Sequence, residues 1–284
     1  MAIVESPPHA TKRIPRTLLR RFISPRTLQN VRYRWWSLSS DLPRSVSSHF
    51  TARSPQVRGF GAVNGSSSLA AELQKVNMVE PTRMCRVMTK YGSDKGRLHR
   101  YTTIYSALFK ERYGQALRIL ELGLGTNNPD VPSNMGLFGA PGASLRGWRE
   151  LFPKALIYGA DVDRRILFSE DRIKTFHCDQ LDGSSIRSLW SQPDLQDGVD
   201  ILIEDGLHTF EGNISFLEGS IGHVRPGGIY ITEDIMWNDV ESWYSRIADI
   251  YVRQYPKLEF AFVALVDGEN RASNNMLVIR RGVE

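Results

Sequence analysis

The sequence predicts an α/β fold in which a doubly wound, mostly parallel sheet ends in an antiparallel hairpin. Beyond Leu117, short apolar runs rich in β-branched residues alternate with stretches of helical spacing, which is the pattern of successive βαβ units. Two of these runs stop abruptly at carboxylates, as expected of buried strands that carry acids to one edge of a sheet. Two further strand-like runs, 258–266 and 275–280, are expected to form the hairpin at the far edge.

The other elements are expected in the following order. Helices are predicted over 69–77 and about 103–113, with a turn-rich segment at 91–96 between them. Ser144 is expected to act as the N-cap of the helix that follows it. The alternating part is predicted to contain strands at 118–122, 156–160, 200–204 and 228–232, and helices at 144–151, 184–190, 210–223 and 239–255.

Composition limits the class of protein. A chain of 284 residues is long enough for one large α/β domain with an appendage. Residues 1–60 contain eleven Lys and Arg against two acidic residues, whereas the remainder carries 25 basic and 29 acidic residues, so the folded part is mildly acidic and no nucleic-acid partner is expected. The two cysteines, Cys85 and Cys178, form no pair motif, which indicates neither a disulfide framework nor a zinc site.

Residues 1–70 are expected to be a basic, poorly ordered N-terminal extension, because they are rich in Arg, Ser and Pro. Their mixture of basic and bulky apolar residues would suit the surface of an anionic membrane, and it also resembles a transit peptide. No apolar run approaches the roughly 18 to 20 residues that span a bilayer. We therefore expect a cytoplasmic protein, and both peripheral membrane contact and an organellar transit peptide stay open.

Acidic residues follow two strands that we expect to be neighbours. One strand is followed by Asp205 and, three residues later, by His208, and the other is followed by Glu233 and Asp234. If these strands lie side by side, about 4.8 Å apart, the four side chains converge at the carboxyl edge, where doubly wound sheets bind ligands. Glu204 points to the opposite face of its strand and is left out of the site.

A set of Asp and Glu without cysteine suits Mg²⁺, or Mn²⁺ or Ca²⁺, better than zinc. Mg²⁺ leaves coordination positions to water or substrate, and two vicinal hydroxyls of a sugar could fill them. The metal would stabilise an alkoxide, and His208, with an intrinsic pKa of about 6.5, would accept the proton. The alternative for Asp205 and Asp234 is that they only cap the next helix, and His208 could be a packed loop histidine.

A second group of residues indicates a nucleotide site. The strand at 118–122 runs into Gly123 and Gly125, where missing Cβ atoms let the backbone approach a ligand, but the third glycine of the dinucleotide fingerprint is absent. The next strand ends at Asp161, which could accept hydrogen bonds from both ribose hydroxyls, with Asp163 as the alternative. Another acid, Asp179, follows the strand after that.

Together with Glu121 in the glycine motif, these acids resemble the class I S-adenosylmethionine-dependent methyltransferases. The resemblance implies a Rossmann-like sheet of seven strands. It also implies that the glycine turn passes the methionyl part of the cofactor, that the second acid holds the ribose and that the third flanks the adenine. The residues nominated for cofactor binding are Glu121, Gly123, Gly125, Asp161 and Asp179.

The spacing of the metal-side residues resembles, more specifically, the Mg²⁺-dependent macrolide-sugar and rhamnosyl O-methyltransferases. That resemblance covers about residues 88–281 and implies that Asp205, Glu233 and Asp234 hold Mg²⁺ and that His208 is the general base. The acceptor would be a sugar hydroxyl of a natural product, polysaccharide or glycolipid. Residues 71–284 would form the methyltransferase domain, with a helical lid at about 71–115, and a homo-oligomer is expected.

Three other functions stay open. A catechol or another vicinal diol could replace the sugar as acceptor on the same fold. The protein could instead be a non-catalytic nucleotide-binding scaffold of a glycan pathway. A nicotinamide dehydrogenase is disfavoured by the incomplete glycine fingerprint.

Overall fold

The computed structural model describes residues 55–60, 68–78, 81–97, 99–136, 139–265 and 273–283. All of them belong to the unit Ser47–Glu284. Most of the expected basic extension lies outside these residues, and the expected membrane contact and transit peptide therefore lie outside them too. No helix among the described residues is long and apolar enough to cross a membrane.

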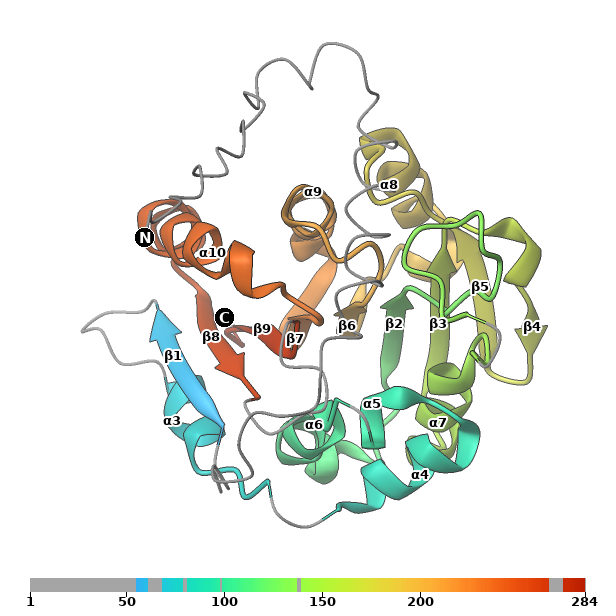
Figure 1. The fold of residues 1–284 in the computed structure, drawn as a ribbon, viewed down its shortest axis with the longest axis horizontal. Helices are drawn as coiled ribbons and strands as arrows, with labels where there is room; N and C mark the ends of the chain where they lie inside the picture. The colour runs from blue at the N-terminus through green and yellow to red at the C-terminus, as the bar shows by residue number, and fades with distance from the viewer. Residues whose placement is uncertain are drawn as a thin grey trace, which may run out of the picture. The chain divides into compact units, whose positions relative to one another are not determined.

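One mixed sheet contains all nine strands of the described residues, in the order β1-β8-β9-β7-β6-β2-β3-β5-β4 (Figure 1). Five central strands, β5, β3, β2, β6 and β7, are parallel, and the other four pair antiparallel with their neighbours. The strands are β1 Gln56–Phe60, β2 Arg118–Leu122, β3 Leu156–Asp161, β4 Ser169–Glu170, β5 Ile173–His177, β6 Val199–Glu204, β7 Val224–Thr232, β8 Leu258–Ala264 and β9 Asn275–Arg281.

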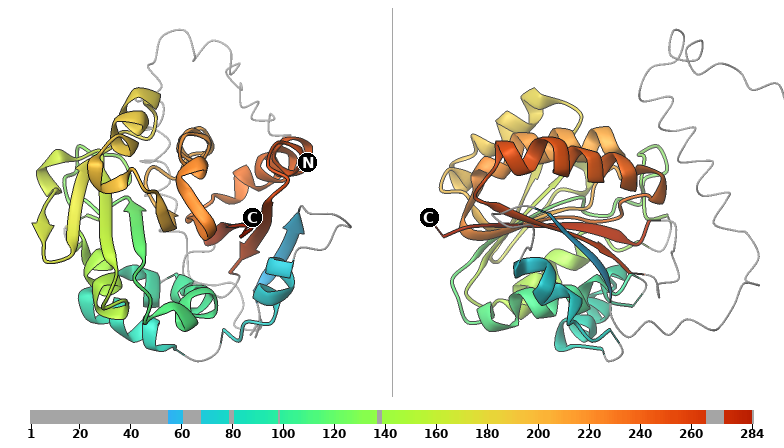
Figure 2. Two further views of the ribbon diagram at one scale, coloured as in Figure 1. Left: turned by 180° about the vertical axis from the view of Figure 1, so that it is seen from behind. Right: turned by 90° about the vertical axis from the view of Figure 1, so that its left-hand side faces the viewer.

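Helices cover both faces of the sheet, which lies between two helical layers in Figure 2. On one face, strand residues such as Ile119 and Ile157 pack against α3, α4, α6 and α7, and on the other Leu120 and Tyr158 belong to the core beneath α8, α9 and α10. Because successive side chains of a strand point to opposite faces of the sheet, each face has its own hydrophobic core. The helices are α3 Ser68–Gln74, α4 Arg83–Tyr91, α5 Asp94–Arg97, α6 Tyr101–Phe109, α7 Ala143–Leu151, α8 Gly183–Trp190, α9 Phe210–Ser220, α10 Val240–Arg246 and α11 Val252–Gln254, with a π-helical turn at Ile247–Tyr251.

The predicted α/β fold with a mostly parallel sheet and an antiparallel C-terminal hairpin is confirmed. β8 and β9 form the hairpin, with β9 next to β7, but β1 pairs on the outer side of β8 and takes the edge position. The first five residues of β9 are all buried, as expected of a strand with both faces covered. β1 and the two-residue β4 add two strands to the seven expected.

β1 lies inside the range that we expected to be poorly ordered. All five of its residues pair with β8. In α3, Gln74 donates from Nε2 to the carbonyl of Pro55 and accepts from the backbone N–H of Val57. The expectation of poor order therefore does not hold for β1, and residues 1–54 and 61–67 lie outside the described part of the chain.

The helices before β2 differ most from the prediction. α4 was not expected, although Thr82 caps it by accepting from the N–H of Cys85 and Gly92, at φ 86°, ends it. α5 begins within the segment expected to be only turns, 91–96, and ends one residue beyond it. The predicted cap of α7 is wrong, because Gly142 occupies that position and the hydroxyl of Ser144 points instead toward the sheet.

The strand order reverses between β2 and β6. From β2 the chain continues through α7 to β3 and β5 on one side, whereas β6 and β7 lie on the other side. In doubly wound sheets, ligands bind outside the carboxyl ends of the strands at such a reversal. The ends of β2, β3, β6 and β7 therefore define the place where a site is expected.

Candidate active site

The predicted acids of the metal side meet at this edge of the sheet. β6 and β7 are parallel neighbours with Glu204 opposite Thr232, and so Asp205 and Glu233 emerge side by side. The N–H of Glu233 donates to the carbonyl of Glu204 at 2.8 Å, which extends the pairing past the strand ends. The convergence predicted from the sequence is present in the structure.

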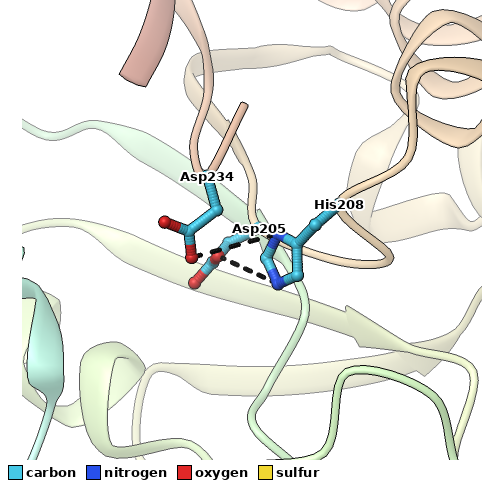
Figure 3. Close-up of side chains that lie close together, drawn as sticks. All are labelled: Asp205, His208 and Asp234. Atoms are coloured by element: carbon cyan, nitrogen blue, oxygen red, sulfur yellow. Dashed lines mark ion pairs between the residues drawn. The ribbon is translucent and has the colours of Figure 1, made fainter. Parts of the chain in front are cut away.

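Asp205, His208 and Asp234 form a group whose ligand atoms all lie within 4.8 Å of one another (Figure 3). His208 Nε2 is 4.0 Å from Asp205 Oδ1, and His208 Nδ1 is 4.0 Å from Asp234 Oδ2. Nδ1 is buried and makes no hydrogen bond. Two carboxylates and a free imidazole nitrogen are a donor set that fits a divalent cation.

Two members of this group have an unusual backbone conformation. His208 has φ 56° and Asp234 has φ 51°, in the left-handed region that non-glycine residues seldom adopt. Such conformations cost free energy and cluster at binding and catalytic sites, where surrounding structure enforces them. The backbone thus supports a functional interpretation of these residues rather than simple helix capping.

Side chains from α5 and α6 hold the remaining oxygens of the acids. Lys95 Nζ donates to Asp205 Oδ2 at 2.5 Å and to Glu233 Oε2 at 2.6 Å. Tyr101 donates to Asp234 Oδ1 at 2.6 Å, and Tyr105 donates to Glu233 Oε1. Asp205 and Asp234 therefore each keep one oxygen toward His208, whereas both oxygens of Glu233 already have partners.

These contacts distinguish Glu233 from the two aspartates. Glu233 is buried and bound by Lys95 and Tyr105, and it is not a member of the group of three that could hold a metal. Its predicted role as a metal ligand stays a prediction. The third member of the group that could hold a metal is His208, which the sequence predicts to be a base.

Lys95 and His99 are the cations closest to this cluster among the described residues. Burial opposes the charge of Lys95, but the carboxylates of Asp205, Glu121 and Glu233 raise its pKa well above the usual value. Burial likewise opposes protonation of His99, whose Nδ1 lies 3.4 Å from Asp234 Oδ1, and this carboxylate helps to raise the pKa of His99 to about 9. The neighbouring carboxylates therefore favour the protonated form of both side chains.

The glycine turn is fixed to the end of β3 by Asp161. Asp161 Oδ2 accepts from the N–H of Leu124 at 2.7 Å, and Oδ1 accepts from the N–H of Asp163 at 2.8 Å. Gly123 and Gly125 both have positive φ, at 93° and 75°. The predicted ribose-binding acid thus lies directly beside the predicted cofactor turn.

Asp163, the alternative ribose acid, binds the loop that follows the glycine turn. Its Oδ2 accepts from Thr126 Oγ1 and Asn128 Nδ2, both at 2.6 Å, and Arg165 Nε donates to Oδ1 at 2.6 Å. These bonds lower the pKa of the Asp163 carboxyl, with the Arg165 contact as the largest cause. Asp163 therefore shapes the loop, and the ribose role predicted for Asp161, with Asp163 as the alternative, stays a prediction.

Glu121 is buried beneath the glycine turn and links three parts of the fold. Its carboxylate accepts from Ser144 Oγ and Trp148 Nε1, both at 2.6 Å, and lies 3.5 Å from Lys95 Nζ. It therefore joins β2 to α7 and to α5. Its predicted contact with the cofactor, like that of Asp179 after β5, stays a prediction.

Sequence reasoning missed Lys95, Tyr105 and Gln180. Tyr105 lies four residues after Tyr101 and so shares one face of α6 with it, a spacing that could have drawn attention to Tyr105. Gln180 accepts from the N–H of Leu207 at 2.9 Å and donates to Glu204 Oε1 at 3.1 Å. It thereby fixes the loop that carries His208, and no sequence signal indicated this contact.

Comparison with known proteins points to one class of enzyme. No family model matches the sequence. An 8-demethyl-8-alpha-L-rhamnosyl tetracenomycin-C 2'-O-methyltransferase from Streptomyces olivaceus is 33% identical over 146 residues, which are 51% of this chain and 36% of that enzyme. The demethylmacrocin O-methyltransferase of Streptomyces fradiae is 35% identical over 141 residues, 49% of this chain and 33% of its own length. The chain thus matches about a third of the length of these relatives.

A solved structure extends the likeness to the fold. The MycE methyltransferase of the mycinamycin biosynthetic pathway, in complex with Mg and SAH, has a TM-score of 0.51 and 24% identity, covering 75% of this chain and 60% of MycE. This chain has the fold of that methyltransferase. A further MycE structure holds Mg, SAH and mycinamycin VI together. The resemblance inferred from the strand-end residues is therefore confirmed by sequence and by fold.

Proposed function

We propose that this protein is a Mg²⁺-dependent O-methyltransferase that moves a methyl group from S-adenosylmethionine to a sugar hydroxyl. The observation that carries the proposal is the common edge of the sheet, where the glycine turn, Asp161 and the group of Asp205, His208 and Asp234 lie at the strand reversal. The sugar O-methyltransferases that the chain resembles support the choice of acceptor.

The residues of the metal side have separate tasks in this proposal. Asp205 and Asp234 would hold the cation through the oxygens that face His208, and Glu233 is proposed as the third acid of the site. A divalent cation there supplies Lewis-acid chemistry for a hydroxyl that loses its proton. His208 would accept that proton at a ring nitrogen, and the absence of a hydrogen bond at its buried Nδ1 supports this role.

The residues of the cofactor side position the methyl donor. Gly123 and Gly125 provide a backbone that a ligand can approach closely, Asp161 is proposed to hold the ribose, and Glu121 and Asp179 complete the nominated set. S-adenosylmethionine supplies a methyl group on a sulfonium, which an oxygen nucleophile can attack. Because both sites lie at one edge, the protein would hold acceptor and donor in reacting orientation.

The experiment is product analysis by mass spectrometry after incubation with S-adenosylmethionine, Mg²⁺ and a panel of acceptors. Rhamnosides and other deoxysugar glycosides form one arm, and catechols form the other. Methylated glycosides support the proposal, whereas methylated catechols alone would change the acceptor class. Turnover that persists in excess chelator would remove the metal from the mechanism, and failure to bind the cofactor would reject the enzyme itself.

The remaining expectations about partners and cellular location stay predictions. They concern a homo-oligomer, contact of the basic segment with a membrane, the absence of a nucleic-acid partner and a cytoplasmic location. Size-exclusion chromatography with light scattering measures the first of these directly.

A further inference from the structure

Lys95 places an ammonium group inside the cluster of carboxylates. Its Nζ lies 2.5 Å from Asp205 Oδ2, 2.6 Å from Glu233 Oε2 and 3.5 Å from Glu121 Oε1. These three acids come from β2 and from the residues that follow β6 and β7, whereas Lys95 comes from α5. The Lys95 side chain thus links α5 to three strands of the sheet, β2, β6 and β7.

The burial of this group makes its charge important. Lys95 is 2% exposed, and Glu121 and Glu233 are each 1% exposed. Charges removed from water need a partner of opposite sign, because desolvation otherwise outweighs what the fold gains. Within the described part of the chain, no other lysine or arginine has a nitrogen within 4.0 Å of these three carboxylates. Lys95 therefore supplies a positive charge that offsets part of the negative charge of these three acids, and burial itself raises the pKa of Asp205 and Glu233.

The other side chains that reach the acids have different roles. Tyr101 and Tyr105 donate hydroxyl hydrogen bonds, which orient Asp234 and Glu233 without adding charge. His99 lies beside Asp234, with its second nitrogen 3.7 Å from Asp94 Oδ2, and has no ion pair with Asp205 or Glu233 among the described contacts. Among the residues that the structure describes, only Lys95 combines a full charge with direct contact to Asp205, which also belongs to the group that fits a metal.

We propose that Lys95 is a built-in cation that keeps the metal-free cluster folded and limits the affinity of the site for a divalent ion. The inference rests on the proposed metal site. Asp205 gives one oxygen to Lys95 and directs the other toward His208, so that an ion bound there would share this carboxylate with the ammonium. Two cations on one carboxylate repel each other, and removal of the ammonium leaves negative charge that a metal can neutralise.

The test compares full-length wild type with Lys95→Met, Lys95→Gln and Lys95→Arg after treatment with chelator. Binding of Mn²⁺ is followed by electron paramagnetic resonance, and the melting temperature is measured with and without Mg²⁺. The two neutral variants should melt below wild type without metal, gain more than wild type when Mg²⁺ is added and bind Mn²⁺ about tenfold more tightly or better. Lys95→Arg keeps the charge and should stay near wild type in affinity.

The matched control is Lys90→Met. Lys90 pairs with Glu150 at 2.6 Å, but its side chain is 61% exposed and the pair lies outside the cluster, so this variant should leave the affinity for Mn²⁺ unchanged. Lys95→Gln retains hydrogen-bond donors, and it provides the neutral variant for the Mn²⁺ measurement if Lys95→Met does not fold. Folding of a neutral variant only in the presence of metal would support the proposal.

Equal or weaker binding of Mn²⁺ by both neutral variants would overturn the inference and leave the proposed function intact. So would failure of both to fold even at saturating Mn²⁺, because the metal could then not replace the ammonium. Absence of Mn²⁺ binding by wild type and by both folded neutral variants would instead reject the metal part of the proposed function, and the inference with it.

Discussion

Asp205 and Asp234 use their two oxygens for different tasks. Lys95 holds one oxygen of Asp205, Tyr101 holds one oxygen of Asp234, and the other oxygen of each faces His208. A carboxylate fixed through one oxygen has less freedom to lose when the second binds a ligand. The site is therefore organised before any ligand arrives.

Replacement of His208 by Ala separates its two possible roles. If His208 is the base, turnover should fall by about 10² to 10⁴ while binding of Mn²⁺ and S-adenosylhomocysteine is retained. If it is chiefly a metal ligand, the affinity for Mn²⁺ should fall as well. Steady-state kinetics and titration of Mn²⁺ make the distinction, and near-normal turnover would contradict both roles.

His223→Ala is the control for this variant. His223 stacks on Trp190 with ring centroids 4.3 Å apart, in the part of the sheet where β7 begins. Its loss removes an imidazole and a packing contact without touching the candidate site. Turnover of the control should therefore stay close to that of wild type.

The glycine turn and the Asp205 loop are in direct contact, which gives Gly123 a second function. A Cβ at Gly123 would lie 1.9 Å from the carbonyl oxygen of Asp205, and the residue has φ 93°. Gly123→Ala should therefore displace the metal-side loop and weaken binding of both Mn²⁺ and S-adenosylhomocysteine. We expect a loss of about 2 kcal/mol or more in the free energy of unfolding, measured in urea.

Gly114→Ala is the matched control, because a Cβ there would meet nothing within 4 Å. Its stability and its binding of both ligands should match those of wild type. Wild-type affinity for Mn²⁺ in Gly123→Ala would show that the two loops do not depend on each other.

The pairing of β6 with β7 buries an acid that the site does not use. Glu204 is 1% exposed, and burial raises the pKa of its carboxyl from 4.5 to about 7. Its Oε2 makes no hydrogen bond, and neither does the hydroxyl of Thr232 opposite it on β7. A raised pKa means that the folded state binds this proton more tightly, so wild type loses stability as pH rises from 4.5 toward 7.

Glu204→Gln should remove this loss. In chelator-treated protein, the variant should exceed wild type by about 2 to 3 kcal/mol in the free energy of unfolding above pH 7. The difference should shrink toward zero below pH 4.5, where Glu204 is protonated in both states. Urea unfolding at a series of pH values tests this, with Glu111→Gln as a control whose side chain is 87% exposed. A pH-independent difference would contradict the explanation.

The local pattern of apolar residues was enough to predict the strands and the acidic residues at their ends. The observed bounds of β2 are the predicted ones, since its apolar run has clear limits. Asp161 is the last residue of β3, whereas Asp205 and Glu233 follow β6 and β7, and the alternating pattern predicts the direction of all three strands. The partners of these acids could not be predicted in this way. Lys95 is 110 residues from Asp205 in the chain, and only the packing of α5 against the sheet edge brings the two together.

Bound ligands should stabilise the folded protein through two groups of residues, those proposed to hold the metal and those proposed to hold the cofactor. At a concentration 100 times its dissociation constant, each ligand adds about 2.7 kcal/mol to the free energy of unfolding. Mg²⁺ and S-adenosylhomocysteine should therefore each raise the melting temperature, and chelator should reverse only the effect of Mg²⁺. Differential scanning calorimetry provides the measurement.

Two variants act as controls for each other in this experiment. Asp205→Asn should lose the shift caused by Mg²⁺ and keep that caused by S-adenosylhomocysteine, whereas Asp161→Asn should do the reverse. Asn at position 161 can still accept the hydrogen bond from the N–H of Leu124. Loss of both shifts in both variants would mean that the two groups form a single unit rather than two sites.

The position of β9 between β7 and β8 has a consequence for biosynthesis. During translation β8 emerges before β9, yet its neighbours in the sheet are β9 and β1. The outer edge of β7 therefore stays unpaired until β9 has left the ribosome, and β1, which is synthesised first, has no partner until β8 emerges. Late pairing of distant segments slows folding and exposes strand edges to other chains. The lateral edge of β7 is thus open to other chains until β9 pairs with it.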